Sequence, residues 1–220
     1  MVRFDDLTYS YPGKTSGLKN INLSIEKGSC VFICGSASEY KTTILNLIYG
    51  QIFPSSGEIK IFDYVLPEDK KKLHQIRAKI GYAFHPLQFF ENLTVKENLL
   101  IPLLIRGKKN KQDINKVVDE CIEEMTDLNP LSLVKTLSSS EKQELNLLRA
   151  FVVNPILLLA DEPFKYLHRD DMERWIKIFQ NKANSGMTII ATSANSNIPE
   201  KFGIKFYILK DGKLNTGDEK

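Results

Sequence analysis

The first part of the chain shows an alternation of hydrophobic and polar residues that predicts β-strands. Residues 4–9 and 21–25 alternate with a period of two, which is typical of strands with one buried face. Turn-forming pairs stand at 12–13 and 27–28. Residues 2–34 are therefore expected to be mainly strand. Further along, we expect helices at 42–49 and 70–79 and strands at 57–62 and 80–84.

The middle of the chain changes to a helical period. Thr94 and Glu97 form a capping-box pattern, in which each side chain bonds the backbone of the other. Residues 110–125 carry an apolar stripe at helical spacing. A second capping box at Ser138–Glu141 opens a helix that should run to about residue 153. We therefore predict a helical subdomain at about 93–153 within a single domain of residues 1–220.

The last third returns to strands. Residues 156–160 are a continuous apolar run, which is typical of a strand covered on both faces of a parallel sheet. A helix is expected at 169–182 and a strand at 188–192. Residues 205–214 should close the chain as a hairpin, because the Asp-Gly pair inside them favours a tight turn. The pattern as a whole is that of an α/β fold.

One stretch, VFICGSASEYKTT at 31–43, carries candidate chemistry. An apolar strand ends at Gly35, and Lys41-Thr42 stand where a phosphate-binding P-loop, G-x-x-x-x-G-K-[ST], has its lysine and hydroxyl residue. In such a loop, backbone N–H groups and a helix N-terminus surround a polyphosphate. The glycine expected before the lysine is Tyr40. Taken alone, this spacing also fits a strand-loop-helix junction that binds nothing.

A pair of carboxylates supplies the second half of the motif. The apolar run at 156–160 ends in Asp161 and Glu162. An aspartate at that place can hold the Mg²⁺ that bridges nucleotide phosphates, and a glutamate beside it can act as general base on water. The alternative is a buried strand that happens to end in acidic loop residues.

Composition narrows the function classes. The net charge of +3 over 220 residues is too small to favour nucleic acid as a partner. Three cysteines show no metal-binding or disulfide spacing, so a reducing compartment is expected. We expect no signal peptide, and no apolar run approaches the roughly 20 residues that span a bilayer.

The order of these motifs resembles that of ATP-binding-cassette (ABC) ATPase subunits. The matching features are Tyr11 before a Pro-Gly turn, the P-loop, a connecting loop at 84–87, a signature-like segment at 137–143, the Asp161-Glu162 strand end, a linking loop at 164–168 and a switch strand ending at Thr192-Ser193. The segment LLLADEP at 157–163 and the spacing of the motif residues within 80–103 resemble the sequences of one subgroup. This subgroup contains the cell-division ATPase FtsE and the lipoprotein-releasing ATPase LolD.

The resemblance implies a P-loop NTPase fold of the ABC-ATPase type, with an antiparallel β subdomain and a helical subdomain. It implies ATP and Mg²⁺ as cofactors, and a head-to-tail homodimer, or a heterodimer with another ABC ATPase. It also implies a permease-like membrane subunit, similar to FtsX or LolC, docked near residues 84–93. The protein would then lie in the cytoplasm, peripheral to the inner face of the membrane.

The resemblance also assigns roles to individual residues. Nucleotide binding falls to Tyr11, Gly35, Ser36, Ala37, Ser38, Glu39, Tyr40, Lys41, Thr42 and Thr43. Metal binding falls to Thr42 and Asp161, and the catalytic base is Glu162. The signature residues that would contact the nucleotide of the other subunit are Leu137, Ser138, Ser139, Ser140 and Glu141. His85 belongs to the coupling loop and Ser193 to the switch.

Several positions depart from the family pattern. Tyr40 and Ser38 stand in place of glycines, and Glu39 adds a negative charge near a polyanion site. Ser139 and Ser140 replace the signature glycines. His85 replaces a glutamine, His168 an aspartate and Ser193 a histidine that contacts γ-phosphate. These losses predict a subunit that binds nucleotide weakly and hydrolyses it slowly or not at all. The alternatives are a fully active ATPase and a structural subunit that binds no nucleotide.

Overall fold

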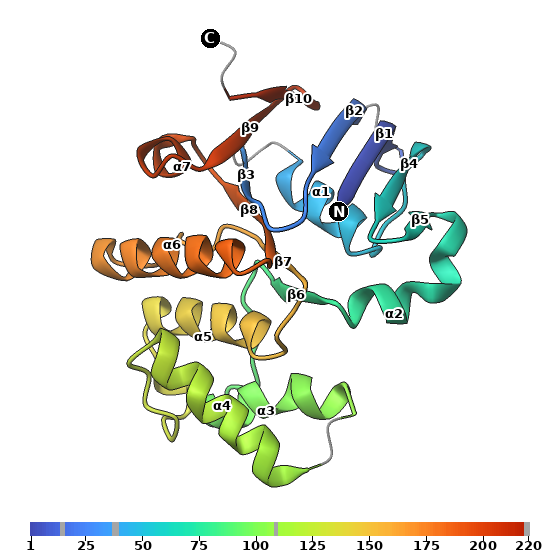
Figure 1. Cartoon of the computed structure of the whole chain (residues 1–220). Coiled ribbons are helices and arrows are strands. Elements are labelled where there is room, and N and C mark those ends of the chain that lie inside the picture. Colours follow the sequence, from blue (N-terminus) through green and yellow to red (C-terminus); the bar gives the residue numbers. More distant parts are fainter. Residues whose placement is uncertain (14–15, 37–39, 108–109, 218–220) are drawn as a thin grey trace.

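The computed structural model describes residues 1–13, 16–36, 40–107 and 110–217 (Figure 1). Four strands form an antiparallel sheet in the order β2-β1-β4-β5. Their bounds are Val2–Ser10 for β1, Gly17–Ile25 for β2, Ser56–Ile61 for β4 and Tyr64–Leu66 for β5. The period-two alternation expected from the sequence is confirmed, because buried and exposed residues alternate through much of β1 and β2.

A second sheet has six strands in the order β10-β9-β3-β8-β7-β6. Its bounds are Cys30–Cys34 for β3, Ile80–Ala83 for β6, Leu157–Ala160 for β7, Thr188–Ser193 for β8, Lys205–Lys210 for β9 and Lys213–Thr216 for β10. All neighbouring pairs are parallel except β9 and β10, which form the expected antiparallel hairpin. The apolar runs at β3 and β7 are fully explained by this central position.

Helices cover both faces of the parallel sheet, so consecutive residues of a strand enter different cores. Leu157 and Leu159 pack with α1 (Lys41–Ile48) and the antiparallel sheet. Leu158, between them, packs with α5 (Ser139–Phe151) and α6 (Arg169–Asn184). Gly81 in β6 permits the close approach of α5, because a Cβ there would collide with the carbonyl oxygen of Ala150.

The predicted helices between 93 and 153 are α3 (Val95–Ile105), α4 (Lys111–Met125) and α5, at the lower end of Figure 1. Both predicted capping boxes are confirmed. The Thr94 hydroxyl accepts the Glu97 N–H, and the Glu97 carboxylate accepts the Thr94 N–H at 2.7 Å. Ser138 and Glu141 repeat this arrangement at the start of α5.

The expected helix at 70–79 is wrong in extent. The segment is a 3₁₀ turn, Glu68–Lys72, followed by a short α2, Leu73–Arg77. Asp69 leaves helical geometry there, and its carboxylate accepts the Val65 N–H at 2.9 Å, which ties the segment to β5. Strand β5, the 3₁₀ turn Val134–Thr136 and helix α7 (Asn197–Lys201) were not expected. No helix of the described residues is both long and apolar enough to cross a bilayer.

Candidate functional site

The strand order places three motif-bearing strand ends side by side. Strands β3, β8 and β7 are parallel neighbours, so their carboxyl ends meet at one edge of the sheet. Gly35 follows β3, Ser193 ends β8 and Asp161 follows β7. The Gly35 N–H donates to the Ser193 carbonyl at 3.1 Å. The topology therefore gathers residues from distant parts of the sequence into one candidate nucleotide site.

Lys41 is the cation at the centre of this edge. It opens α1, and only 4% of its surface is exposed. Its ammonium donates to the carbonyls of Gly35 at 2.7 Å and Ser36 at 2.9 Å, and it lies 3.2 Å from the Glu162 carboxylate. A buried ammonium beside a helix N-terminus suits a phosphate group. Here the ammonium is fixed by backbone oxygens and by the predicted base.

Asp161 is held by two hydroxyl groups. Thr42 donates to one carboxylate oxygen at 2.7 Å, and Thr192 donates to the other at 2.6 Å. The Thr192 hydroxyl also accepts the Glu162 N–H at 2.8 Å. Thr192 therefore links the predicted metal ligand to the predicted base. The sequence analysis assigned it no role, although its place at the end of a strand beside β7 was a usable signal.

Thr42 and Asp161 fit a magnesium ion. Their hydroxyl and carboxylate oxygens are the hard donors that Mg²⁺ prefers, and they already lie in contact. No group of three or more His, Cys, Asp or Glu side chains among the described residues forms a ready metal site. These two residues would hold Mg²⁺ together with phosphate oxygens and water, and the ion would neutralise charge on the phosphates.

Aromatic residues lie near the start of α1. The Tyr11 hydroxyl lies 2.6 Å from the Thr43 hydroxyl oxygen. The Tyr11 ring contacts Tyr9 edge-on, with ring centres 5.1 Å apart, and lies 6.0 Å from the Tyr40 ring. Tyr40 directly precedes α1 and makes no side-chain cap bond. The three loop residues Ala37, Ser38 and Glu39 lie outside the described residues.

Three further predicted residues lie at or after the ends of β6, β7 and β8. His85 lies just beyond β6, with its Nε2 atom 3.5 Å from the Lys165 ammonium. Ser193 is 7% exposed, and its hydroxyl oxygen accepts the Asn195 N–H at 3.4 Å. His168 caps α6 with its backbone only. The His85 imidazole and the short Ser193 hydroxyl therefore both lie near the strand ends. Among the described residues, the polar contacts of these two groups are with Lys165 and Asn195 rather than with Glu162.

The predicted signature residues lie on a different element, the start of α5. Ser138 donates its hydroxyl to the Glu141 carboxylate at 2.7 Å, so the capping box uses that hydroxyl. Hydrogen bonds from the Ser138 N–H and hydroxyl lower the pKa of Glu141. Ser139 is exposed, and Ser140 is buried with a hydroxyl that has no partner among the described residues. Leu137 is half-buried against the core.

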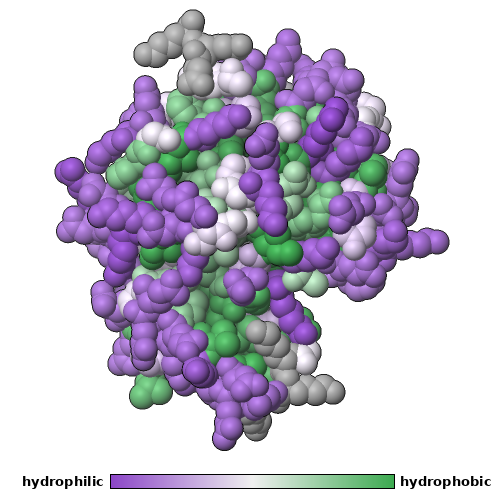
Figure 2. Space-filling model, viewed as in Figure 1, coloured by the Kyte–Doolittle hydropathy of each residue, from purple (hydrophilic) through white to green (hydrophobic). Residues whose placement is uncertain are grey.

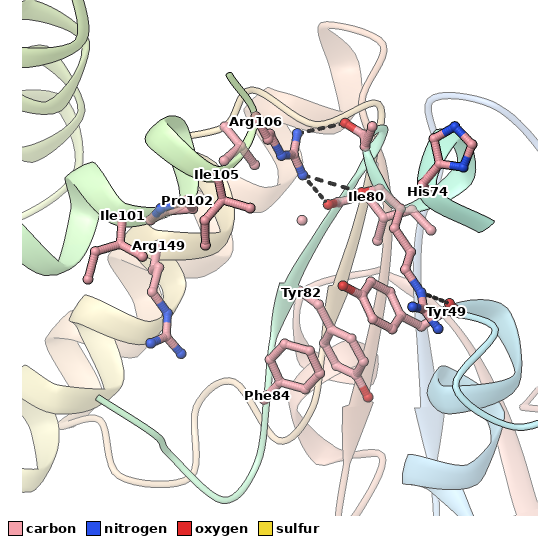
Figure 3. A pocket seen from close by; sticks show the side chains of 14 residues that line it. Tyr49, His74, Ile80, Tyr82, Phe84, Ile101, Pro102, Ile105, Arg106 and Arg149 are labelled. Atoms are coloured by element: carbon pink, nitrogen blue, oxygen red, sulfur yellow. Dashed lines mark hydrogen bonds between the residues drawn. The ribbon is translucent and has the colours of Figure 1, made fainter. Parts of the chain in front are cut away.

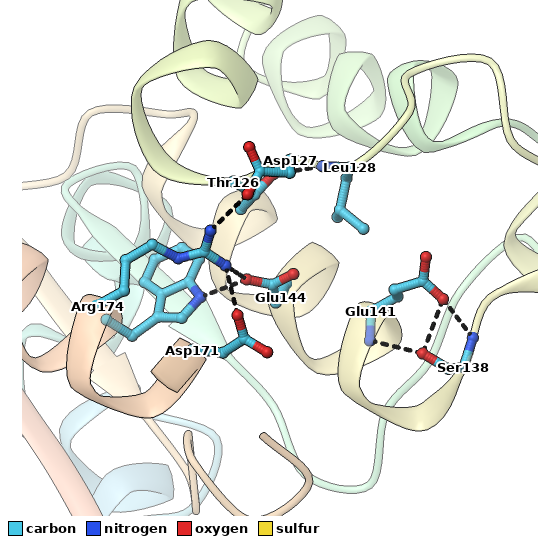
Figure 4. A network of polar contacts seen from close by, with 9 residues as sticks. Thr126, Asp127, Leu128, Ser138, Glu141, Glu144, Asp171 and Arg174 are labelled. Atoms are coloured by element: carbon cyan, nitrogen blue, oxygen red, sulfur yellow. Dashed lines mark hydrogen bonds and ion pairs between the residues drawn. The ribbon is translucent and has the colours of Figure 1, made fainter. Parts of the chain in front are cut away.

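An ionic network around the buried Glu144, missed by the sequence analysis, ties α5 to α6 (Figure 4). Arg174 pairs with Glu144, with Asp171 at 3.0 Å and with Asp127 at 3.0 Å. The Trp175 indole N–H donates to Glu144 at 3.0 Å. Burial raises the pKa of Glu144, while the bonds from Trp175 and Arg174 act in the opposite direction. The network fixes the signature helix against the helix that follows the linking loop.

The thiol nearest this edge is not a nucleophile. Burial raises the pKa of Cys34 to about 12, so its thiol stays protonated at neutral pH. The chemistry available at the strand ends is therefore that of a cation, two carboxylates and hydroxyl groups. That set can hold a metal-bound polyphosphate and position a water.

A P-loop α/β fold with such a site is typical of nucleotide-binding proteins. Comparisons with known proteins identify the family. The model of the ABC transporter family matches residues 18–165, and the chain belongs to that family. The carnitine transport ATP-binding protein OpuCA of Listeria monocytogenes is 31% identical over 232 residues, which cover all of this chain and 56% of OpuCA. The chain thus spans about half the length of that relative.

Two further relatives match over nearly their full length. The cell division ATP-binding protein FtsE of Escherichia coli is 28% identical over 219 residues, covering 99% of this chain and 98% of FtsE. The bacterial ABC transporter cassette MJ0796, solved as a dimer, has a TM-score of 0.86 and 29% identity, covering 97% of this chain and 96% of that one. Another dimeric structure of MJ0796 is bound to ADP and Pi. The predicted ABC-ATPase fold is confirmed.

Proposed function

We propose that this protein is the ATP-binding subunit of an ABC-transporter-type complex, with weak or lost ATP hydrolysis, that couples nucleotide binding to a membrane partner. The observation that carries the proposal is the meeting of Lys41, Thr42 and Asp161 at one sheet edge. These supply the positive charge and the metal ligands that Mg·ATP requires. MJ0796, similar over nearly its whole length, has been solved with ADP and Pi bound.

The residues around the predicted base, Glu162, support the proposal of weak hydrolysis. Glu162 is present and pairs with Lys41 at 3.2 Å. The switch position offers only the Ser193 hydroxyl, which is shorter than an imidazole and already accepts a backbone N–H. At the signature, Ser139 and Ser140 bring side chains where glycine would allow close backbone approach. Turnover needs an aligned γ-phosphate, and these residues are poorly suited to align it.

A partner would dock in the groove beside the connecting loop (Figure 3). This groove has a volume of about 540 Å³ and lies between α3 and the strand β6 with its aromatic rings. The rings of Tyr82 and Phe84 stack on one side of the groove, with their centres 3.9 Å apart. Ile105, which is 80% exposed, lies on the other side. On the face shown in Figure 2, hydrophilic residues cover most of the outline, and hydrophobic residues gather toward the middle. An exposed apolar groove on such a surface is a candidate protein-binding site.

The charge of the groove indicates the chemistry of the occupant. Arg77, Arg106 and Arg149 line it, and their guanidinium groups donate to backbone carbonyls. None of the ion pairs found among the described residues includes these three arginines. Burial lowers the pKa values of Arg106 and Arg149. The occupant we propose is a short amphipathic segment of a permease-like subunit, carrying a carboxylate for these arginines.

The loop at 84–93 contributes a second apolar contact. Phe90 is 59% exposed, whereas Phe89 is half-buried and lies under the Arg149 guanidinium at 4.8 Å from its ring centre. Of the two phenylalanines, Phe90 is therefore the one placed to meet a partner. Attachment through this partner would keep the protein peripheral at the inner face of the membrane. The role would be that of an FtsE-like subunit with an FtsX-like partner, or a LolD-like one with a LolC-like partner.

The direct test is a titration of Mg·ATP into the purified protein, with affinity measured by calorimetry and association by light scattering. Saturable binding accompanied by dimer formation is the expected result. Binding without association would favour a heterodimer with another ABC ATPase. An absence of binding at millimolar Mg·ATP would contradict the proposal and leave only a structural role.

A further inference from the structure

The first turn of α1 presents three groups to a phosphate, and each already has a partner inside the chain. The Lys41 ammonium is held by backbone carbonyls and Glu162. The Thr42 hydroxyl donates to Asp161 at 2.7 Å. The Thr43 hydroxyl is bonded to Tyr11 at 2.6 Å. A polyphosphate entering here must exchange these internal bonds for its own.

The Tyr11–Thr43 bond differs from the other two because it comes from an aromatic side chain. Thr43 is only 2% exposed, so its hydroxyl would be left without a partner if Tyr11 moved away and nothing replaced it. The Tyr11 ring is also held from two sides, edge-on by Tyr9 at 5.1 Å and by Tyr40 at 6.0 Å. Tyr40 thus helps to keep Tyr11 over the helix start.

From this geometry we propose that Tyr11, supported by Tyr40, acts at the phosphate end of the site and holds Thr43 until a polyphosphate displaces it. The proposal rests on the proposed nucleotide binding and specifies how that site is regulated. It differs from a role in stacking on the base, because the contact involves the phenol hydroxyl and the first turn of α1. The ligand class concerned is any Mg²⁺-bound polyphosphate, with or without a base.

The test compares Mg²⁺-tripolyphosphate with Mg·ATP by calorimetry. Tyr11→Phe keeps the ring but removes the hydroxyl, so the empty site loses its internal bond. Affinity for tripolyphosphate should rise about fivefold, the effect of one neutral hydrogen bond. Tyr9→Phe is the matched control, since it removes a hydroxyl from the same ring cluster that is not the one bonded to Thr43. It should leave affinity unchanged.

A double-mutant cycle distinguishes this role of Tyr11 from a general loosening of the site by the substitution. In a Thr43→Val background, Tyr11→Phe should change tripolyphosphate affinity by less than twofold, because the bond is already absent. An unchanged affinity in Tyr11→Phe alone would overturn the inference while leaving nucleotide binding intact. The inference would also be overturned if Tyr11→Ala lost affinity for ATP but bound tripolyphosphate as well as wild type does. That pattern is expected of a residue that stacks on the base. If no variant binds either ligand, the proposed nucleotide binding fails as well.

Discussion

The Lys41 ammonium lies 3.2 Å from the Glu162 carboxylate, so the predicted phosphate-binding cation and the predicted base neutralise each other. Glu162 has a left-handed backbone conformation, with φ of +46°, and its N–H is anchored to Thr192 at 2.8 Å. The Glu162 backbone is therefore held in place, while its side chain is held by the ion pair with Lys41. A bound γ-phosphate would draw the ammonium away and release the carboxylate toward water.

Loss of the cation should abolish most nucleotide affinity. Lys41→Ala removes a charge-assisted contact to phosphate, which is worth about 1.5–3 kcal/mol, or roughly 10- to 150-fold in affinity. Mg·ATP binding measured by calorimetry should fall by at least tenfold. Lys19→Ala, at an exposed lysine outside this site, is the control and should bind like wild type. Similar affinities in the two variants would contradict the assignment of Lys41.

Removing the ring at Tyr40 should strengthen nucleotide binding. Tyr40 precedes Lys41 at the start of α1, and its ring leans toward Tyr11. Tyr40→Gly restores freedom for the backbone to approach phosphate. We expect affinity to rise about tenfold, which corresponds to roughly 1.4 kcal/mol. Glu39→Ser should add to this by removing a negative charge. Unchanged affinity in both variants would remove the steric and the electrostatic arguments together.

Charge placed in the groove should prevent membrane recruitment. Ile105 is 80% exposed and lines the groove, so Ile105→Glu brings an acidic group into an apolar contact. The bound fraction of protein sedimenting with membrane vesicles from the native cells should fall at least fivefold. Leu131→Glu is the matched control for Ile105→Glu, because Leu131 is 75% exposed and does not line the groove.

Protease treatment of the vesicles identifies the kind of partner. Binding of wild type that disappears after digestion indicates a membrane protein. Binding that survives digestion, or that Ile105→Glu leaves unaltered while the fold is intact, would contradict docking of a permease-like segment in the groove.

The capping box before α3 should make stability depend on pH. Bonds from the Thr94 N–H and hydroxyl lower the pKa of Glu97 below its usual 4.5. Because the folded-state pKa is depressed, the stabilisation is complete above the unfolded value and disappears as pH falls through the folded value. Glu97→Gln should therefore be less stable than wild type in urea at pH 7, and the difference should shrink at pH 3. A constant difference would show that the carboxylate charge is not involved.

Much of this fold could be predicted because its signals are local. The capping boxes at Thr94 and Ser138 need only four consecutive residues. The apolar run at 156–160 predicts a buried strand by itself. The Thr42–Asp161 contact, 119 residues apart, was accessible only through the resemblance, which supplies the strand order. The bond from Tyr11 to Thr43 and the Glu144–Arg174 network have no local pattern. They depend on how elements pack, which periodicity does not encode.

The most direct measurement of the central claim is phosphate release by wild type and by Glu162→Gln at saturating Mg·ATP, each with and without the membrane partner. The predicted base, Glu162, is present, but Ser193 stands where the resemblance leads us to expect a histidine. Losing one preorganised donor typically costs about 10²- to 10³-fold in rate. When several groups act together in catalysis, the rate effects of losing each one do not multiply, so we use the effect of a single loss. We expect the same background rate for both proteins under both conditions. A clear wild-type rate that disappears in Glu162→Gln would contradict this expectation and establish a working ATPase.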